Sequence, residues 1–367
     1  MGIMKGRSPK FDEWLWSLDE ERLAGLRLED LPKESAGDGI DFPQITTATV
    51  ISDLANPLSL IAQNGVGIDD SRETAWGGLL RASLGGKPYV VGLWSAGSGV
   101  FVFFGSVPAT DSRWDRVEKS WINRSAPSLS RMLLNQDDFS DLGDVLSEHG
   151  EVSVSRMTAR VVSDGSSYSR GWPGELVVER PNHRDALREL STGSMVLRTI
   201  TLSAGKRLAV HLRQQAGATF YWGDFPLFVN LVLGRFTSLA QERIGIIDGA
   251  NREPRERITE VIRMSFELDR SLVRNALVEG LGTTPGVRAA VLHSDAYLHM
   301  IITDYLNGSN CDLIVTEANE LRMIPGFKAS PASMSRIADA VGESLGMLEF
   351  SSENLLELDD EAGLISS

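Results

Sequence analysis

The residues best suited to chemistry cluster between His293 and Cys311. His293, His299 and the single cysteine lie close in sequence, and a cysteine beside a histidine is the pairing used in nucleophilic catalysis. On a strand running from Tyr297, alternation places His299 and Asp304 on opposite faces, which disfavours a simple metal pair. Most lone cysteines are buried packing residues, so we expect Cys311 to be structural.

Two carboxylates follow this cluster. Asp312 and Glu317 flank a short apolar strand, as the acidic residues that hold Mg²⁺ in nucleases do. The lysine that usually follows the second acid is absent, and the two positions have opposite strand parity. A hydrolase with an unrecognised site near residues 293–317 therefore stays open only as an alternative. Phosphate-binding glycine loops and zinc-binding histidine helices are absent, so no cofactor or metal site is predicted.

The charge is unevenly distributed along the 367 residues, whose net charge is −14. Residues 151–274 contain 18 basic and 14 acidic side chains, which gives the only positive segment, and all but one of its basic residues are arginine. Arginine suits bidentate contact with phosphate. Tyr221 and Trp222 lie in this segment and could stack on bases. These features support nucleic-acid binding or processing as an alternative, although the segment is less basic than most nucleic-acid modules.

Composition sets further limits. The chain is 42% hydrophobic with one cysteine, which excludes a disulfide framework and a zinc site built from several cysteines. The start of the chain does not resemble a signal peptide, and its most apolar run, 225–233, is far shorter than a membrane span of about 20 residues. We therefore expect a cytoplasmic protein that does not contact a membrane.

An amphipathic helix is predicted near the N-terminus. Phe11, Trp14, Leu15 and Leu18 share one helical face, and a linker is expected over 34–41. Trp14 and Trp16 cannot both lie on that face, so one of them is expected to anchor a protein partner. Residues 1–36 are accordingly interpreted as a helical extension.

Three units of mixed α and β character are predicted beyond this extension. Hairpins are expected around 97–99 and 307–310, where glycine, serine and asparagine favour turns. The longest helix is expected over 254–277. The predicted boundaries are 37–150, 151–280 with the long helix, and 281–350 as a hairpin with a helix, followed by an acidic tail over 351–367.

One organisational pattern recurs. A strand, a glycine-rich turn, a second strand and an amphipathic helix occur around 87–122 and again around 297–345, and 196–240 resembles a third copy. Because the residues themselves show no matching period, the pattern fits either a repeat or ordinary antiparallel hairpins flanked by helices.

The expected fold class is therefore α+β, with antiparallel sheets covered by amphipathic helices. The leading functional hypothesis is a non-enzymatic interaction protein, an adaptor or assembly component of a bacterial cytoplasm, with another protein as its partner. Nucleic-acid binding through the middle segment and hydrolysis near 293–317 remain the alternatives, and whether the chain is an enzyme stays open.

Overall fold

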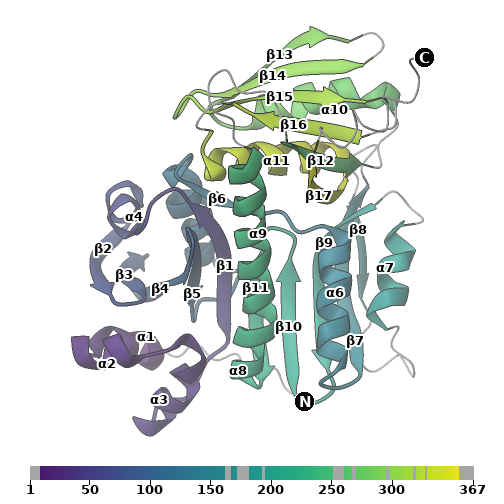
Figure 1. Cartoon of the computed structure of the whole chain (residues 1–367). Helices are drawn as coiled ribbons and strands as arrows, with labels where there is room; N and C mark the ends of the chain where they lie inside the picture. Colours follow the sequence, from purple (N-terminus) through teal and green to yellow (C-terminus); the bar gives the residue numbers. More distant parts are fainter. Residues whose placement is uncertain are drawn as a thin grey trace.

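The computed structural model describes residues 9–161, 167–171, 182–191, 195–250, 260–266, 270–294, 297–316, 320–326 and 329–354. Within these ranges the chain forms two antiparallel sheets with helices packed on them (Figure 1). This confirms the α+β class.

The N-terminal segment and the first unit span residues 9–125. The segment contains α1 (Pro9–Ser17), α2 (Glu20–Gly25), the 3-10 turn η1 (Leu28–Asp30) and α3 (Leu31–Gly37). The first unit contains β1 (Ile45–Ser52), α4 (Leu58–Asn64), β2 (Ile68–Thr74), β3 (Gly77–Leu84), β4 (Lys87–Gly97), β5 (Val100–Gly105), α5 (Ser112–Arg116), the π-helical η2 (Val117–Ile122) and η3 (Asn123–Ser125).

The second unit contains β6 (Leu129–Arg131), α6 (Gln136–Ser147), β7 (Val152–Val161), β8 (Ser167–Gly171), α7 (His183–Ser191), β9 (Met195–Ala204), β10 (Leu208–Arg213), β11 (Gly217–Gly223), α8 (Phe225–Leu227), the π-helical η4 (Phe228–Leu233) and α9 (Gly234–Ala250). The third unit contains β12 (Glu260–Phe266), α10 (Arg270–Thr283), β13 (Val287–His293), β14 (Leu298–Asp304), β15 (Asn310–Val315), β16 (Glu320–Pro325), α11 (Pro331–Leu345) and β17 (Met347–Asn354).

The first two units share one sheet. Its strand order is β2-β3-β4-β5-β1-β11-β10-β9-β7-β8, and β6 also pairs with β1. The third unit forms a second sheet of order β13-β14-β15-β16-β12-β17. β1 is therefore the strand that joins the first two units.

The units repeat one topology. In the first unit a strand and a helix (β1, α4) precede four consecutive strands, and the last of them, β5, returns to pair with β1. The third unit repeats this order, because β12 and α10 precede β13 to β16, and β16 returns to pair with β12. The second unit has the same order with β8 and α7 inserted, except that its last strand, β11, pairs with β1. The pattern expected from the sequence is thus present as a repeat of topology.

Local sequence explains the element boundaries. The turn between β4 and β5 is Gly97-Ser98-Gly99, and all three residues have positive φ, which glycine adopts freely. Helix α6 begins with a capping box in which Asn135 and Asp138 exchange side-chain and backbone hydrogen bonds. Gly346 ends α11 in the left-handed conformation.

Three hydrophobic clusters hold these layers together. The first lies between the shared sheet and the layer formed by α1 to α3, α6 and α9. The second is inside the third unit and includes Ile247 of α9. The third covers the opposite face of the first unit, beneath α4, α5 and η2, around Trp114 and Trp121. Among the described residues, the helices therefore cover both faces of the first unit and one face of the second.

A buried ion pair joins the third unit to the second. Arg243 on α9 contacts Asp339 on α11 at 2.9 Å, and the same guanidinium donates to the carbonyl oxygen of Leu133. The Leu133 backbone N–H donates in turn to Asp339. Burial raises the pKa of Asp339 to about 6, and breaking such a buried pair leaves an uncompensated charge.

Three expectations require correction. The helix predicted over 254–277 is wrong, because 260–266 forms β12 and the helix α10 begins only at Arg270. The linker predicted over 34–41 is partly helical, since α3 extends to Gly37. Residues 351–354 of the predicted tail are instead part of a strand, because β17 runs to Asn354 and pairs with β12. Residues 355–367 lie outside the described residues.

Replacing Phe11 with alanine tests how the N-terminal segment is attached. Phe11 is 0% exposed and belongs to the first cluster, so Phe11→Ala should lower the free energy of unfolding by about 3 kcal/mol or more. Denaturant unfolding measures this, with Glu13→Ala on the exposed side of α1 as control. An unchanged midpoint would show that α1 is a separable extension.

Asp12 should make stability depend on pH. Burial raises its pKa to about 6, although the Ser106 hydroxyl donates to it at 2.7 Å. Because the folded pKa lies above the unfolded one, protonation stabilises the fold at low pH, and this contribution is lost as pH rises through about 6.

Asp12→Asn should therefore increase the free energy of unfolding above about pH 6, by at most about 3 kcal/mol for a shift of about two units. The difference should vanish near pH 4. Unfolding curves across this range measure it, and a difference that is constant with pH would contradict the assignment.

Candidate functional site

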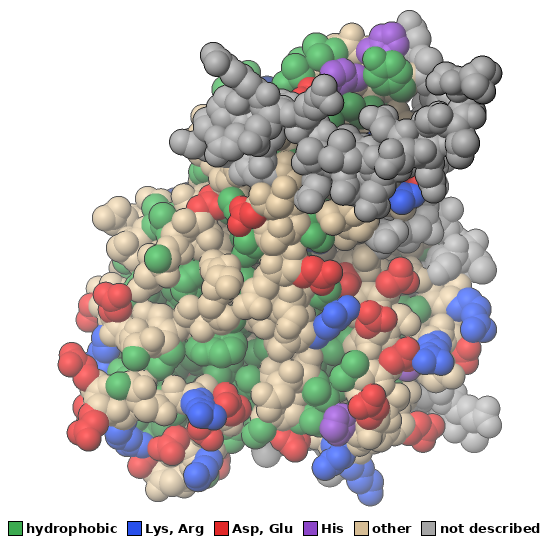
Figure 2. Space-filling view, viewed as in Figure 1, with side chains coloured by type: hydrophobic (Ala, Val, Ile, Leu, Met, Phe, Trp, Pro, Cys, Tyr) green, Lys and Arg blue, Asp and Glu red, His purple; other side chains and the backbone are tan. Residues whose placement is uncertain are grey.

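Most of the arginines that the structure describes in the positive middle segment are engaged within the fold. Arg184 pairs with Asp144 at 2.8 Å and Arg235 pairs with Asp141 at 3.0 Å. Arg198 pairs with Glu343, while Arg243 is in the buried ion pair. On the face viewed in Figure 2, acidic and basic side chains are intermixed over the lower part of the molecule. The positive balance of residues 151–274 therefore does not form one broad basic surface on this face.

The two tryptophans predicted to bind a partner occupy different places. Trp14 is 7% exposed, belongs to the first cluster, and donates from Nε1 to Asp38 at 2.7 Å. Trp16 is half-buried, and the guanidinium groups of Arg72 and Arg81 lie over its ring at 5.2 and 5.8 Å. Trp14 is thus part of the core, and only the ring of Trp16 lies partly at the surface.

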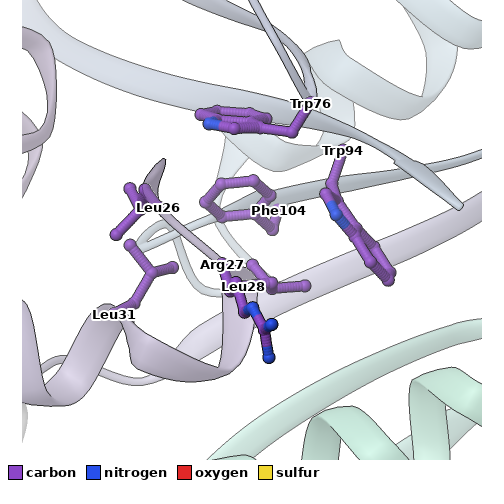
Figure 3. A pocket seen from close by; sticks show the side chains of 7 residues that line it. All are labelled: Leu26, Arg27, Leu28, Leu31, Trp76, Trp94 and Phe104. Carbon is purple, nitrogen blue, oxygen red and sulfur yellow. The ribbon is translucent and has the colours of Figure 1, made fainter. Parts of the chain in front are cut away.

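An apolar pocket lies where the N-terminal segment meets the first unit. Figure 3 shows Leu26, Leu28 and Leu31 facing the rings of Trp76, Trp94 and Phe104, which come from the turn before β3, from β4 and from β5. Its free volume is about 10 Å³, roughly one water probe. Trp76 also donates from Nε1 to the carbonyl oxygen of Leu23 at 2.9 Å. The pocket is therefore the packing contact that holds the N-terminal segment rather than a ligand site.

A larger groove of about 230 Å³ opens beside this pocket. Leu18 and Leu26 lie within it, and Glu21, Asp30 and Glu34 line it together with Arg22. Arg22 pairs with Asp38 at 2.8 Å. The hydrogen bonds from Trp14 and Arg22 lower the pKa of Asp38.

The cluster predicted near 293–317 is only partly brought together. His299 on β14 contacts Asp312 on β15 at 2.9 Å, across the side of the third sheet that carries no helix. Cys311 faces the opposite side and packs in the second cluster. Cys311 and His299 therefore lie on opposite sides of the sheet, and the cysteine–histidine pairing considered for catalysis does not form between them. Asp295 and Glu317 lie outside the described residues.

The chemistry of this cluster is correspondingly limited. Burial raises the pKa of the Cys311 thiol, which disfavours the reactive thiolate. The ring of His293 lies 4.5 Å from that of Tyr297. In the part of the chain that the structure describes, no group of three or more histidine, cysteine, aspartate or glutamate side chains could hold a metal ion.

A polar cluster that sequence reasoning missed lies on the uncovered face of the second unit. His211 on β10 contacts the Thr201 hydroxyl at 2.9 Å through Nδ1, and its ring lies 6.4 Å from that of Tyr221. Burial, with Arg213 and Arg156 nearby, lowers the pKa of His211 to about 4. The imidazole is therefore neutral at pH 7. Only the pairing of β9, β10 and β11 brings these side chains together.

Among the described residues, the β13 edge of the third sheet carries several exposed apolar side chains. β13 ends the strand order, and Figure 1 shows it at the top of the molecule. Leu292 is 56% exposed and Tyr297 is 43% exposed, with Ile301 beside them on β14. In Figure 2, hydrophobic and histidine side chains gather in this upper region.

The corresponding edge of the first unit is built differently. β2 occupies the same topological position, and four of its seven residues are charged: Asp69, Asp70, Arg72 and Glu73. Charged residues on an edge strand discourage pairing with another chain. Among the seven residues of β13, Arg288 is the one with a permanent charge, and Ala289 and Ala290 beside it are exposed. Charged residues thus discourage pairing with another chain at the β2 edge, whereas the β13 edge lacks this protection.

Comparison with known proteins adds no functional information. No protein-family model matches the chain, and no curated protein matches it. None of the described helices is long and apolar enough to cross a membrane.

Cys311 provides a test of the 293–317 cluster. A thiol reagent should label the native protein slowly and the denatured protein rapidly, because the side chain is buried. Cys311→Ala should cost about 1 kcal/mol or somewhat more in stability, as expected for a small buried group. Rapid labelling of the native protein, confirmed at Cys311 by mass spectrometry, would overturn the structural assignment.

Proposed function

We propose that this chain is an interaction protein whose third unit binds an extended segment of a partner protein along β13. The observation that carries the proposal is the unprotected edge of β13 beside exposed apolar side chains. An added strand gains main-chain hydrogen bonds from the edge, while alternate side chains contact the adjoining face. The proposal retains the hypothesis of an adaptor or assembly protein but does not depend on Trp14.

The surface around β13 favours a particular partner chemistry. Ala290 and Leu292 offer apolar contacts, and Ile301 extends them onto β14. Arg288 donates to the carbonyl oxygen of Val287 and has no carboxylate partner among the described residues. Arg288, Ala290 and Ile301 lie on the same side of the sheet. A partner strand that presents apolar side chains and an acidic one on this side would therefore complement both the apolar contacts and the positive charge.

Photo-crosslinking in native cells identifies the partner. A photoreactive amino acid at Ala290 should crosslink to an extended, acidic segment of another protein, whereas the same group at Val278 on α10 serves as the exposed control. Crosslinks only to a second copy of this chain would overturn the proposal, because the occupant would then be the protein itself.

Charge variants then test the edge with the purified full chain and the identified partner. Ala290→Glu should weaken binding by about tenfold or more, equivalent to about 1.4 kcal/mol, because it repels the acidic strand. Ala290→Lys should weaken binding less, and Val278→Glu should leave it unchanged. Equal affinity for Ala290→Glu and Val278→Glu would exclude β13 as the contact.

A further inference from the structure

A second surface, distinct from β13, lies on the uncovered face of the second unit. Residues that alternate along β7, β9, β10 and β11 point to the same side of the sheet. The opposite side buries Ile200, Val210 and Leu212 in the first cluster. On the uncovered side, the strand register instead brings together His211, Thr219 and Thr201, with Arg213 beside Thr199. We call the residues on this side the polar face.

A β-bulge places two aromatic side chains on the polar face. Ala209 pairs with Trp222 and Val210 pairs with Phe220, so Tyr221 is an extra residue in β11. A bulge of this kind re-aims the side chains beside it. Tyr221 lies near His211, and Trp222 shares the side of Ala209 and Ser203. Trp222 is 47% exposed, so its ring is available to a flat ligand.

Positive charge surrounds these rings. Arg156 on β7 is exposed, and it is close enough to influence the pKa of both His211 and Tyr221. Arg213 donates to the carbonyl oxygen of Thr47 and lies 3.5 Å from Glu118, which also lies 3.6 Å from Arg131. Glu118 therefore offsets one of the two charges that it contacts, while the exposed Arg156 has no carboxylate partner among the described residues.

We propose that the polar face binds single-stranded nucleic acid. Tyr221 and Trp222 would stack on bases, which every base permits, while the exposed Arg156 contacts the phosphate backbone. The hydroxyl groups of Thr199 and Thr201 and the neutral His211 add hydrogen bonds. Four-stranded sheet faces of this size hold about two or three stacked bases. A duplex does not fit the same contacts, because its bases are already stacked on one another.

Fluorescence anisotropy with labelled 12-nucleotide strands of DNA and RNA tests the proposal on the full chain. Binding should be strongest at low salt and weaken as salt rises, with a slope of about −0.7 per phosphate contacted. Trp222→Ala should weaken binding about tenfold, Trp222→Phe should retain most of it, and Arg156→Gln should reduce the salt slope by about 0.7. Tyr305→Ala and Arg274→Gln, exposed in the third unit, are the matched controls.

Several outcomes would overturn the proposal. These are no binding at low salt, equal binding of the matching duplex, or equal affinity of Trp222→Ala and Tyr305→Ala. Circular dichroism of each variant separates lost binding from lost folding, and Trp222→Phe keeps the test decisive if Trp222→Ala is destabilised. Because β13 lies in the other sheet, Ala290→Glu should not alter nucleic-acid binding, so this test and the partner test can fail independently.

Discussion

The fold depends on β1 being paired along both edges and covered on both faces. On one edge it pairs with β5, and on the other it pairs with β11 and β6. All eight of its residues are buried. Its backbone hydrogen bonds are thus satisfied by two different units, which makes the shared sheet continuous. The buried threonines of β1 suit this position because β-branched side chains pack well on a pleated surface. Displacing β1 would separate the first two units and disrupt the sheet surface on which the N-terminal segment and α9 pack.

The elements that the sequence predicted correctly are those with local signals. The hairpin turns at 97–99 and 307–310 follow from residues that tolerate tight turns, and α11 follows from its serine cap and its apolar periodicity. The helix predicted over 254–277 failed for a physical reason. Val261 and Ile262 are adjacent and both fully buried in β12, so both faces of the strand are covered at this point. A short apolar run covered on both faces does not show strand alternation, so its periodicity cannot distinguish it from a helix.

The candidate surfaces were hard to predict because they depend on contacts between distant residues. Trp14 and Trp16 were predicted to anchor a partner because the local sequence does not show the surface that contacts the N-terminal segment. That surface, around Trp76 and Trp94, lies some sixty to eighty residues further along the chain. The free edge at β13 is visible only once the strand order is known. The polar face similarly requires the pairing of β9 with β10 and the bulge in β11. The sequence shows that Tyr221 and Trp222 are adjacent, but it does not show that both side chains lie on the same side of the sheet.

Repetition of one topology explains why these surfaces exist. A unit of a strand, a helix, four strands and a helix leaves two features to be covered: one face of its sheet and the edge formed by its second strand. In the first unit, helices cover both faces and charges protect the β2 edge. In the second unit, helices cover one face only, and β8 and α7 are inserted beside β7. In the third unit, β17 covers one edge, and β13 ends the sheet among the described strands. The three units therefore cover this face and this edge in different ways. The proposed binding surfaces are one sheet face of the second unit and the β13 edge of the third unit, and the corresponding face and edge of the first unit are covered or protected by charge.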